Sequence, residues 1–77
     1  MSNLPERITI NPNILQGKPT IRGLRISVAH ILSALAAGIS QDELLIDYPE
    51  LEPEDFVAAL TYAATLVEDT KVFPIPN

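Results

Sequence analysis

Cysteine and tryptophan are absent from this 77-residue sequence, which contains one histidine and 3 glycines. Without cysteine, the chain has no disulfide framework and no thiolate zinc site. A single histidine, His30, provides no spacing of metal ligands, and no residue in the sequence is placed to orient it as a catalytic base. We therefore predict that His30 is an exposed helix residue and that the protein binds no metal ion and no cofactor.

Long hydrophobic runs are also lacking. The longest nearly apolar run, residues 56–67, is shorter than the roughly 18 residues that a membrane-spanning helix needs. Residues 1–7 lack the basic start and apolar stretch of an export signal. We therefore expect a cytoplasmic protein that does not cross a membrane. A chain of this length buries only about 60–65% of its unfolded surface, so we also expect a homodimer or another partner to supplement a thin core.

The sequence contains no recognisable catalytic motif. The segment Gly17-Lys18-Pro19-Thr20 differs from a phosphate-binding loop at two positions, because Pro12 replaces the required glycine and Pro19 replaces the serine or threonine after the lysine. No nucleophile motif and no glycine-rich dinucleotide loop is present either. These absences favour a binding protein over an enzyme.

Charge is divided unevenly along the chain, whose net charge is −5. Residues 1–39 carry four cations and one acid, whereas residues 40–77 carry nine acids and one lysine. The overall field repels nucleic acid, so a contact with DNA would depend on the basic first part of the chain, doubled in a dimer.

Two short β segments are predicted before the helices. Residues 7–10 alternate polar and β-branched apolar residues and precede a turn. Residues 20–22 and 25–27 flank Gly23-Leu24, a pair typical of a type II′ hairpin turn. Such a hairpin would place Arg22 and Arg25 opposite each other.

With Lys18, these two arginines are our candidates for binding a carboxylate of a partner protein or a phosphate. The alternative is a solvated hairpin tip without a binding role.

Three helices are predicted over residues 28–37, 41–48 and 53–68. Ser27 can cap the first helix, and Ser40 with Glu43 forms a capping box for the second. The short connection between these two helices is typical of a helix-turn-helix unit. We therefore predict a mainly α fold, a three-helix helix-turn-helix-like (homeodomain-like) bundle with a short N-terminal β-hairpin. It forms a single domain of residues 1–69 with an extended tail of residues 70–77. The predicted structural turns contain Gly17, Gly23 and Gly38.

The third predicted helix is apolar on nearly every side, whereas a surface helix of a small domain should carry one apolar stripe. We therefore predict that part of it forms a dimer or partner interface. The alternative is that its alanines are only good helix formers. The helix has no cation to face DNA phosphates, so it is a poor groove reader. The candidate interface residues, including one in the tail, are Phe56, Val57, Leu60, Leu66, Val67 and Phe73.

Several segments together resemble the bacterial family called domain of unknown function 433, over about residues 7–64. The most specific of them is Gly17 to Ile26. Leu24 and Glu52 depart from the family pattern, in which threonine is usual at the first of these positions and frequent at the second. The other matching segments are Arg7 to Pro12, Ala36 to Ser40, Asp47 to Pro49 and Leu51 to Asp55.

The resemblance implies a homeodomain-like helical fold and a role as an antitoxin-like (VapB-type) protein. Its partner would be a PIN-like ribonuclease toxin with an acidic metal centre, and Arg22, Arg25 or the Phe73 tail would then block that centre. We therefore expect a non-enzymatic antitoxin, a homodimer that neutralises a ribonuclease by protein contact and also regulates its own operon. The alternatives are a stand-alone DNA-binding regulator and a small adaptor for another partner.

Overall fold

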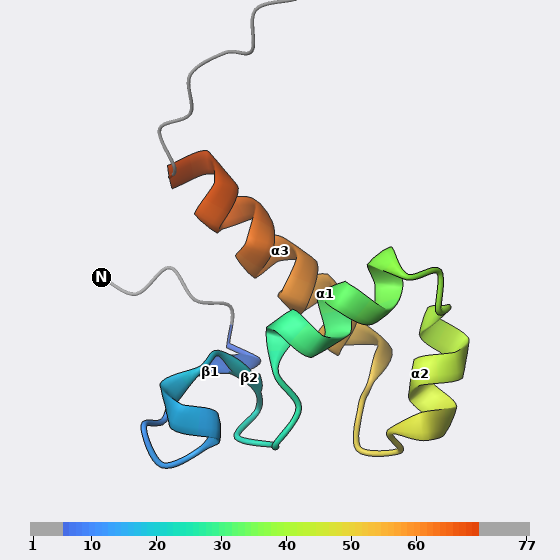
Figure 1. Cartoon of the computed structure of the whole chain (residues 1–77), viewed down its shortest axis with the longest axis horizontal. Helices are drawn as coiled ribbons and strands as arrows, with labels where there is room; N and C mark the ends of the chain where they lie inside the picture. The colour runs from blue at the N-terminus through green and yellow to red at the C-terminus, as the bar shows by residue number, and fades with distance from the viewer. Residues whose placement is uncertain (1–5, 70–77) are drawn as a thin grey trace, which may run out of the picture.

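The computed structural model describes residues 6–69, which form three helices and two short strands (Figure 1). This mainly α fold with an N-terminal antiparallel strand pair confirms the predicted fold at that level. Within these residues, no helix is both long enough and apolar enough to cross a bilayer. In chain order, the elements are β1 (Ile8–Thr9), the 3-10 turn η1 (Leu15–Gly17), β2 (Thr20–Ile21), α1 (Val28–Ala36), α2 (Gln41–Asp47) and α3 (Pro53–Asp69).

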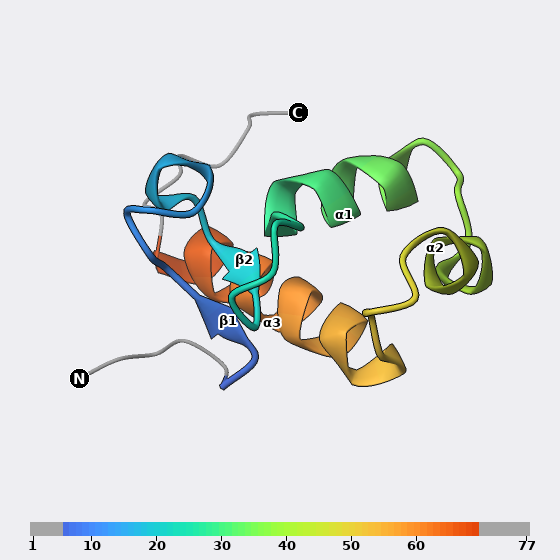
Figure 2. The ribbon, with the colours of Figure 1, turned by 90° about the horizontal axis from the view of Figure 1, so that it is seen from below.

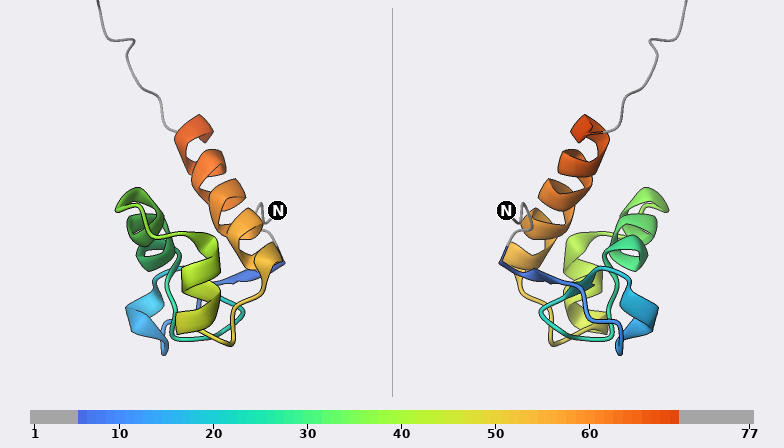
Figure 3. Two further views of the ribbon diagram at one scale, coloured as in Figure 1. Left: turned by 90° about the vertical axis from the view of Figure 1, so that its right-hand side faces the viewer. Right: turned by 90° about the vertical axis from the view of Figure 1, so that its left-hand side faces the viewer.

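The long helix α3 organises the fold, because it contacts α1, α2 and β1. The strands and η1 lie at one end of the molecule and α2 lies at the other (Figure 2). The C-terminal half of α3 projects beyond the other two helices (Figure 3). Only the first half of α3 is therefore covered by the rest of the domain.

The β segments are shorter than predicted. β1 pairs with β2 in antiparallel register, with Ile8 opposite Ile21 and Thr9 opposite Thr20. The third predicted strand, residues 25–27, is reduced to one isolated bridge between Thr20 and Ser27. The first strand is thus 8–9 instead of 7–10, and the second is 20–21 instead of 20–22.

The predicted type II′ turn at Gly23-Leu24 is wrong. The carbonyl of Ile21 accepts a hydrogen bond from the N–H of Leu24 at 2.7 Å, so Arg22 and Gly23 are the two central residues. Both have positive φ angles, 47° and 73°, which is the pattern of a type I′ turn. Arg22 therefore leaves the strand, and the expected pairing of Arg22 opposite Arg25 does not form.

The helices begin and end near the predicted residues, because their ends are encoded locally. The hydroxyl of Ser27 accepts the N–H of His30 at 2.9 Å, and Ser40 and Glu43 form the capping box. α1 ends one residue earlier than predicted, α2 also ends one residue earlier, and α3 ends one residue later.

Gly38 terminates α1. It has a φ of 93°, and its N–H donates to the carbonyl of Leu35 while the N–H of Ile39 donates to the carbonyl of Ala34. These two bonds form a Schellman motif. The motif favours glycine at this position because the residue must adopt a left-handed conformation, which glycine does without steric cost.

The core lies between the strand pair, α1 and the first half of α3. Phe56 is fully buried there, so the prediction that it belongs to an exposed interface is wrong. The reason is its position on the side of α3 that faces the body of the domain. Phe73 lies outside the described residues. The other large buried apolar side chains are Ile8, Ile21, Ile26, Val28, Ile31, Leu44 and Leu51.

Candidate functional site

A buried carboxylate, Asp55, holds two of the four arginine and lysine residues in the first half of the chain. Arg22 donates from Nε to Oδ1 at 3.2 Å and from Nη2 to Oδ2 at 3.0 Å, and it also donates to the carbonyl of Glu50. Arg7 donates to Asp55 Oδ1 at 3.0 Å and to Glu52 at 2.6 Å. The N–H of Glu52 donates to Asp55 Oδ2 at 2.8 Å. Asp55 thus ties the strand region to the start of α3.

The electrostatics of this cluster are those of a structural ion pair. Burial by itself would raise the pKa of Asp55, but hydrogen bonds from Arg22, the Glu52 N–H and Arg7 outweigh it and lower that pKa below its ordinary value. The side-chain hydrogen bond with Asp55 correspondingly raises the pKa of Arg22. Arg22, predicted to bind a partner or nucleic acid, therefore has its guanidinium bound within its own chain.

The sequence predicted Asp55 only as an acid at the start of the third helix, and it did not predict the ion pairs of Asp55 with Arg7 and Arg22. An acid in the first turn of a helix is ordinarily stabilised by the positive end of the helix dipole, so the position of Asp55 does not by itself indicate an ion pair. Its burial depends on packing against the strand region, which the local sequence does not encode.

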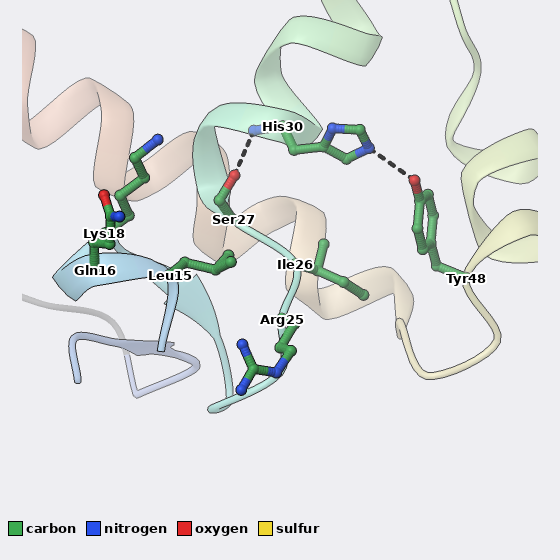
Figure 4. A pocket seen from close by; sticks show the side chains of 8 residues that line it. All are labelled: Leu15, Gln16, Lys18, Arg25, Ile26, Ser27, His30 and Tyr48. Carbon is green, nitrogen blue, oxygen red and sulfur yellow. Dashed lines mark hydrogen bonds between the residues drawn. The ribbon is translucent and has the colours of Figure 1, made fainter. Parts of the chain in front are cut away.

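A pocket of about 470 Å³ lies between η1, the start of α1 and the end of α2 (Figure 4). Figure 4 shows Leu15 and Ile26 in the middle, with Lys18 on one side, Arg25 on another and Tyr48 opposite Lys18. The remaining lining residues are Gln16, Ser27 and His30. We call this the Lys18–Arg25 pocket.

One wall of the Lys18–Arg25 pocket is a contact between His30 and Tyr48. The His30 Nε2 and the Tyr48 hydroxyl are 2.8 Å apart, and the rings meet edge to face with centroids separated by 5.6 Å. His30 is exposed, as predicted, but this partner was not foreseen.

The opposite wall is built from strained backbone. Leu15 and Gln16 have φ angles of 48° and 58°, in the left-handed region that side chains other than glycine's rarely occupy. Gly17 follows with a φ of 82° and completes the turn that leads to Lys18. Such strain is common where a side chain must be aimed at a binding site.

The structure brings Lys18 and Arg25 to one pocket and separates Arg22 from them. The side chains of Lys18 and Arg25 are exposed, and neither forms a salt bridge with any residue in the part of the chain that the structure describes. No carboxylate is among the pocket's lining residues. The pocket therefore carries positive charge on a chain whose net charge is negative.

α3 carries the second candidate surface. Val57, Leu60 and Val67 are 64%, 47% and 69% exposed. With the exposed Ala64 they follow a spacing of three, four and three residues, which places all four on one side of a helix. We call these four residues the α3 stripe. Leu66, also a predicted interface residue, is half exposed and lies on the other side of the helix.

Comparison with known proteins gives the family. The family model described as "protein of unknown function (DUF433)" matches residues 8–63. The chain belongs to the DUF433 family. The matched segment of this DUF433 chain includes Asp55, Arg22 and Glu52 but not Arg7, and it contains every residue that lines the Lys18–Arg25 pocket and the first half of α3.

Two relatives were compared with this DUF433 chain. The crystal structure of a DUF433 member from Anabaena variabilis has a TM-score of 0.75 and 35% identity, covering 80% of this chain and 61% of that one. The "Uncharacterized protein y4eO" of Sinorhizobium fredii is 38% identical over 58 residues, which are 75% of this chain and 26% of the relative. The chain therefore spans about a quarter of the length of that relative.

Proposed function

We propose that this DUF433 protein is a non-enzymatic, antitoxin-like binding module that neutralises a PIN-like ribonuclease by protein contact through the α3 stripe. The observation that carries the proposal is the exposure of Val57, Leu60 and Val67 on one side of a helix that projects from the domain. An apolar stripe at this spacing is the pattern by which a helix binds in an apolar groove of another protein.

The energetics favour a protein partner for this surface. Fully burying a valine or leucine side chain contributes about 1.5–3 kcal/mol. Three such side chains in one row form a compact apolar patch that a partner protein can bury, whereas their exposure to water is unfavourable. The alanine-rich surroundings allow a partner backbone to approach closely.

The charges on α3 disfavour DNA as the primary ligand of this helix. Its first turn carries Glu54 and Asp55, and its described side chains include no cation. Phosphates on both sides of a major groove would repel the acidic end. The helix-turn-helix-like order of α1, α2 and α3 therefore serves, in our proposal, as a scaffold for a protein contact.

A ribonuclease fits the charge of the second half of the chain. An enzyme that cleaves RNA needs a cationic groove for the phosphate backbone. Residues 40–77 carry nine acids and one lysine, so their field attracts such a groove. The version of the hypothesis in which Arg22 enters the toxin's metal centre loses its basis, because Asp55 already binds Arg22. Arg25 stays available for that role.

The test is capture of the partner followed by an activity assay. The tagged chain is used to purify bound protein from native extract, and the eluted partner is assayed for RNA cleavage with and without added chain. We expect a ribonuclease whose activity the wild-type chain inhibits and Val57→Asp/Val67→Asp does not. The control, Ser33→Asp, adds an acid at an exposed position of α1 and should inhibit like the wild type. A captured protein without ribonuclease activity, self-association alone, or equal inhibition by the α3 variant would overturn the proposal.

A further inference from the structure

We infer that the Lys18–Arg25 pocket binds helix α2 of a second copy of this chain, with the exposed Ile46 of that copy seated on Leu15 and Ile26. Acids of the same α2 then lie beside the two cations of the pocket. The contact joins two different surfaces of the chain, so one copy follows the next head to tail. It does not use the α3 stripe, and it does not depend on the proposed inhibition of a ribonuclease.

The pocket has an apolar centre between two separated cations. Leu15 and Ile26 lie in the middle, and the side chains of Lys18 and Arg25 point away from each other on either side (Figure 4). Neither cation has a carboxylate partner among residues 6–69. A complementary surface therefore presents an apolar side chain with a separate acid for each cation, because one anion would not lie beside both.

The apolar centre is formed before any partner arrives. Ile26 packs on the core with 8% of its surface exposed, and Leu15 is half-buried in a turn with left-handed backbone. Both side chains line a pocket of about 470 Å³. A surface that is already ordered loses little conformational freedom on binding, so this centre favours the insertion of an apolar side chain from a partner.

Helix α2 carries an apolar side chain that its own domain does not bury. Leu44 is buried and Leu45 is half-buried, but Ile46 is 78% exposed, more than any other large apolar residue that the structure describes. Successive residues of a helix point about 100° apart, so three in a row cannot all face the core. Ile46 is therefore free to pack against another chain.

Acids lie on both sides of Ile46 along α2. Asp42 precedes it by one helical turn and Asp47 follows it directly, and both are exposed. Neither forms a salt bridge within residues 6–69, whereas Glu43 is held in the capping box by Ser40. Asp42 and Asp47 are about 7.5 Å apart along the helix axis, so they act as two separate anions. α2 thus has the arrangement of charge and apolar surface that complements the pocket.

The charge distribution favours a second copy as the source of this helix. The four cations of residues 1–39 and the nine acids of residues 40–77 give the chain a basic part and an acidic part. The strands and η1 lie at one end of the molecule and α2 lies at the other (Figure 2). Within one chain, α2 reaches the pocket through the adjoining Tyr48, and no acid lines the pocket. The acids that match the cations therefore come from the α2 of another copy.

Sedimentation of the full chain over a range of concentrations measures this association. We expect the average mass to rise with concentration above two chains, with a dissociation constant of about 0.1 mM at about 0.05 M salt. Because salt screens the charge pairs, association should be severalfold weaker at about 0.5 M salt. A chain that stays monomeric, or association that is equal or stronger at the higher salt, would overturn the inference.

Two variants, each defective in one of the two surfaces, identify the contact. Arg25→Glu reverses a charge of the pocket and Ile46→Gln removes the inserted side chain, so each variant alone should associate about tenfold more weakly than the wild type. Both positions are exposed, so neither change disturbs the core. An equal mixture should associate again and stop at two chains, because the intact pocket of one variant binds the intact α2 of the other.

The matched control is Val57→Asp/Val67→Asp, which changes the net charge as much as Arg25→Glu does and alters only the α3 stripe. This variant should associate like the wild type. Undiminished association of Arg25→Glu or Ile46→Gln, a mixture that stays monomeric, or loss of association in the α3 control would each contradict the head-to-tail contact.

Discussion

Asp55 at the start of α3 and Arg22 in the turn after β2 are 33 positions apart and joined by two hydrogen bonds, of 3.0 and 3.2 Å. The carboxylate is fully buried, while the guanidinium is about one-third exposed. This contact holds the left-handed turn at Arg22 against the helix that carries the proposed interface. It therefore connects the basic first part of the chain to the position of α3.

Asp55→Asn should destabilise the protein strongly. The change removes the charge that compensates Arg22 and Arg7, and because both guanidinium groups are about one-third exposed to water, the expected cost is that of lost charged hydrogen bonds, about 1.5–3 kcal/mol. Urea unfolding followed by circular dichroism measures the loss. Glu54→Gln, at the neighbouring exposed acid, is the matched control and should change the free energy of unfolding by less than about 0.5 kcal/mol. Equal effects of the two variants would show that the pair is not structural.

The contribution of Asp55 to the stability of the fold should decrease as the pH falls. The folded-state pKa of Asp55 lies below its ordinary value of 3.8, so the unfolded chain binds the proton more readily than the folded one. The stabilisation is therefore fully present above that ordinary pKa and is lost as the pH falls through the lowered folded value. Thermal unfolding of wild type and Asp55→Asn should differ most near pH 7 and converge as the pH falls through the lowered pKa of Asp55. A gap that widens in acid would contradict this assignment.

The sequence predicted those features whose causes lie within a few residues. Ser27, the Ser40–Glu43 pair and Gly38 place helix ends within one residue because caps act on the adjacent turn. The turn after β2 was missed because Arg22 takes a left-handed conformation while its guanidinium binds a residue 33 positions away.

The candidate sites show the same limit. Lys18 and Arg25 were proposed as binding residues because of their charge. Tyr48, which forms another wall of their pocket, was not foreseen, because its contact with His30 joins residues 18 positions apart. Phe56 was assigned to an interface because a helix that is apolar all round does not reveal which side faces the core. Packing against α1 and β1 decides that question.

The strained turn before Lys18 gives a pair of opposite predictions. Gln16→Gly should raise the free energy of unfolding by about 1 kcal/mol, because glycine adopts its φ of 58° without steric cost. Gly17→Ala should lower the free energy of unfolding by about 1 kcal/mol, because alanine is strained at a φ of 82°. A clash would not contribute, since the added Cβ would meet only Pro12 at an ordinary 3.7 Å. Chemical denaturation of both variants provides the test, and a destabilised Gln16→Gly would show that the Gln16 side chain makes a contact worth more than the strain.

Tyr48→Phe should alter the pocket more than the stability of the fold. The variant removes the hydrogen bond to His30 at a partly exposed position, so the free energy of unfolding should fall by no more than about 1 kcal/mol. The amide and ring signals of His30 should nevertheless shift in NMR spectra. Unchanged His30 signals would mean that the two rings do not meet in solution.

Hydrogen exchange of the purified complex, compared with the free chain, tests the protein-binding role of the α3 stripe most directly. The C-terminal half of α3 projects from the domain, so its amides should exchange rapidly in the free protein. We predict that partner binding slows exchange over residues 57–67, with little change in α2. Unchanged exchange in α3, with protection confined to the Lys18–Arg25 pocket, would contradict the account.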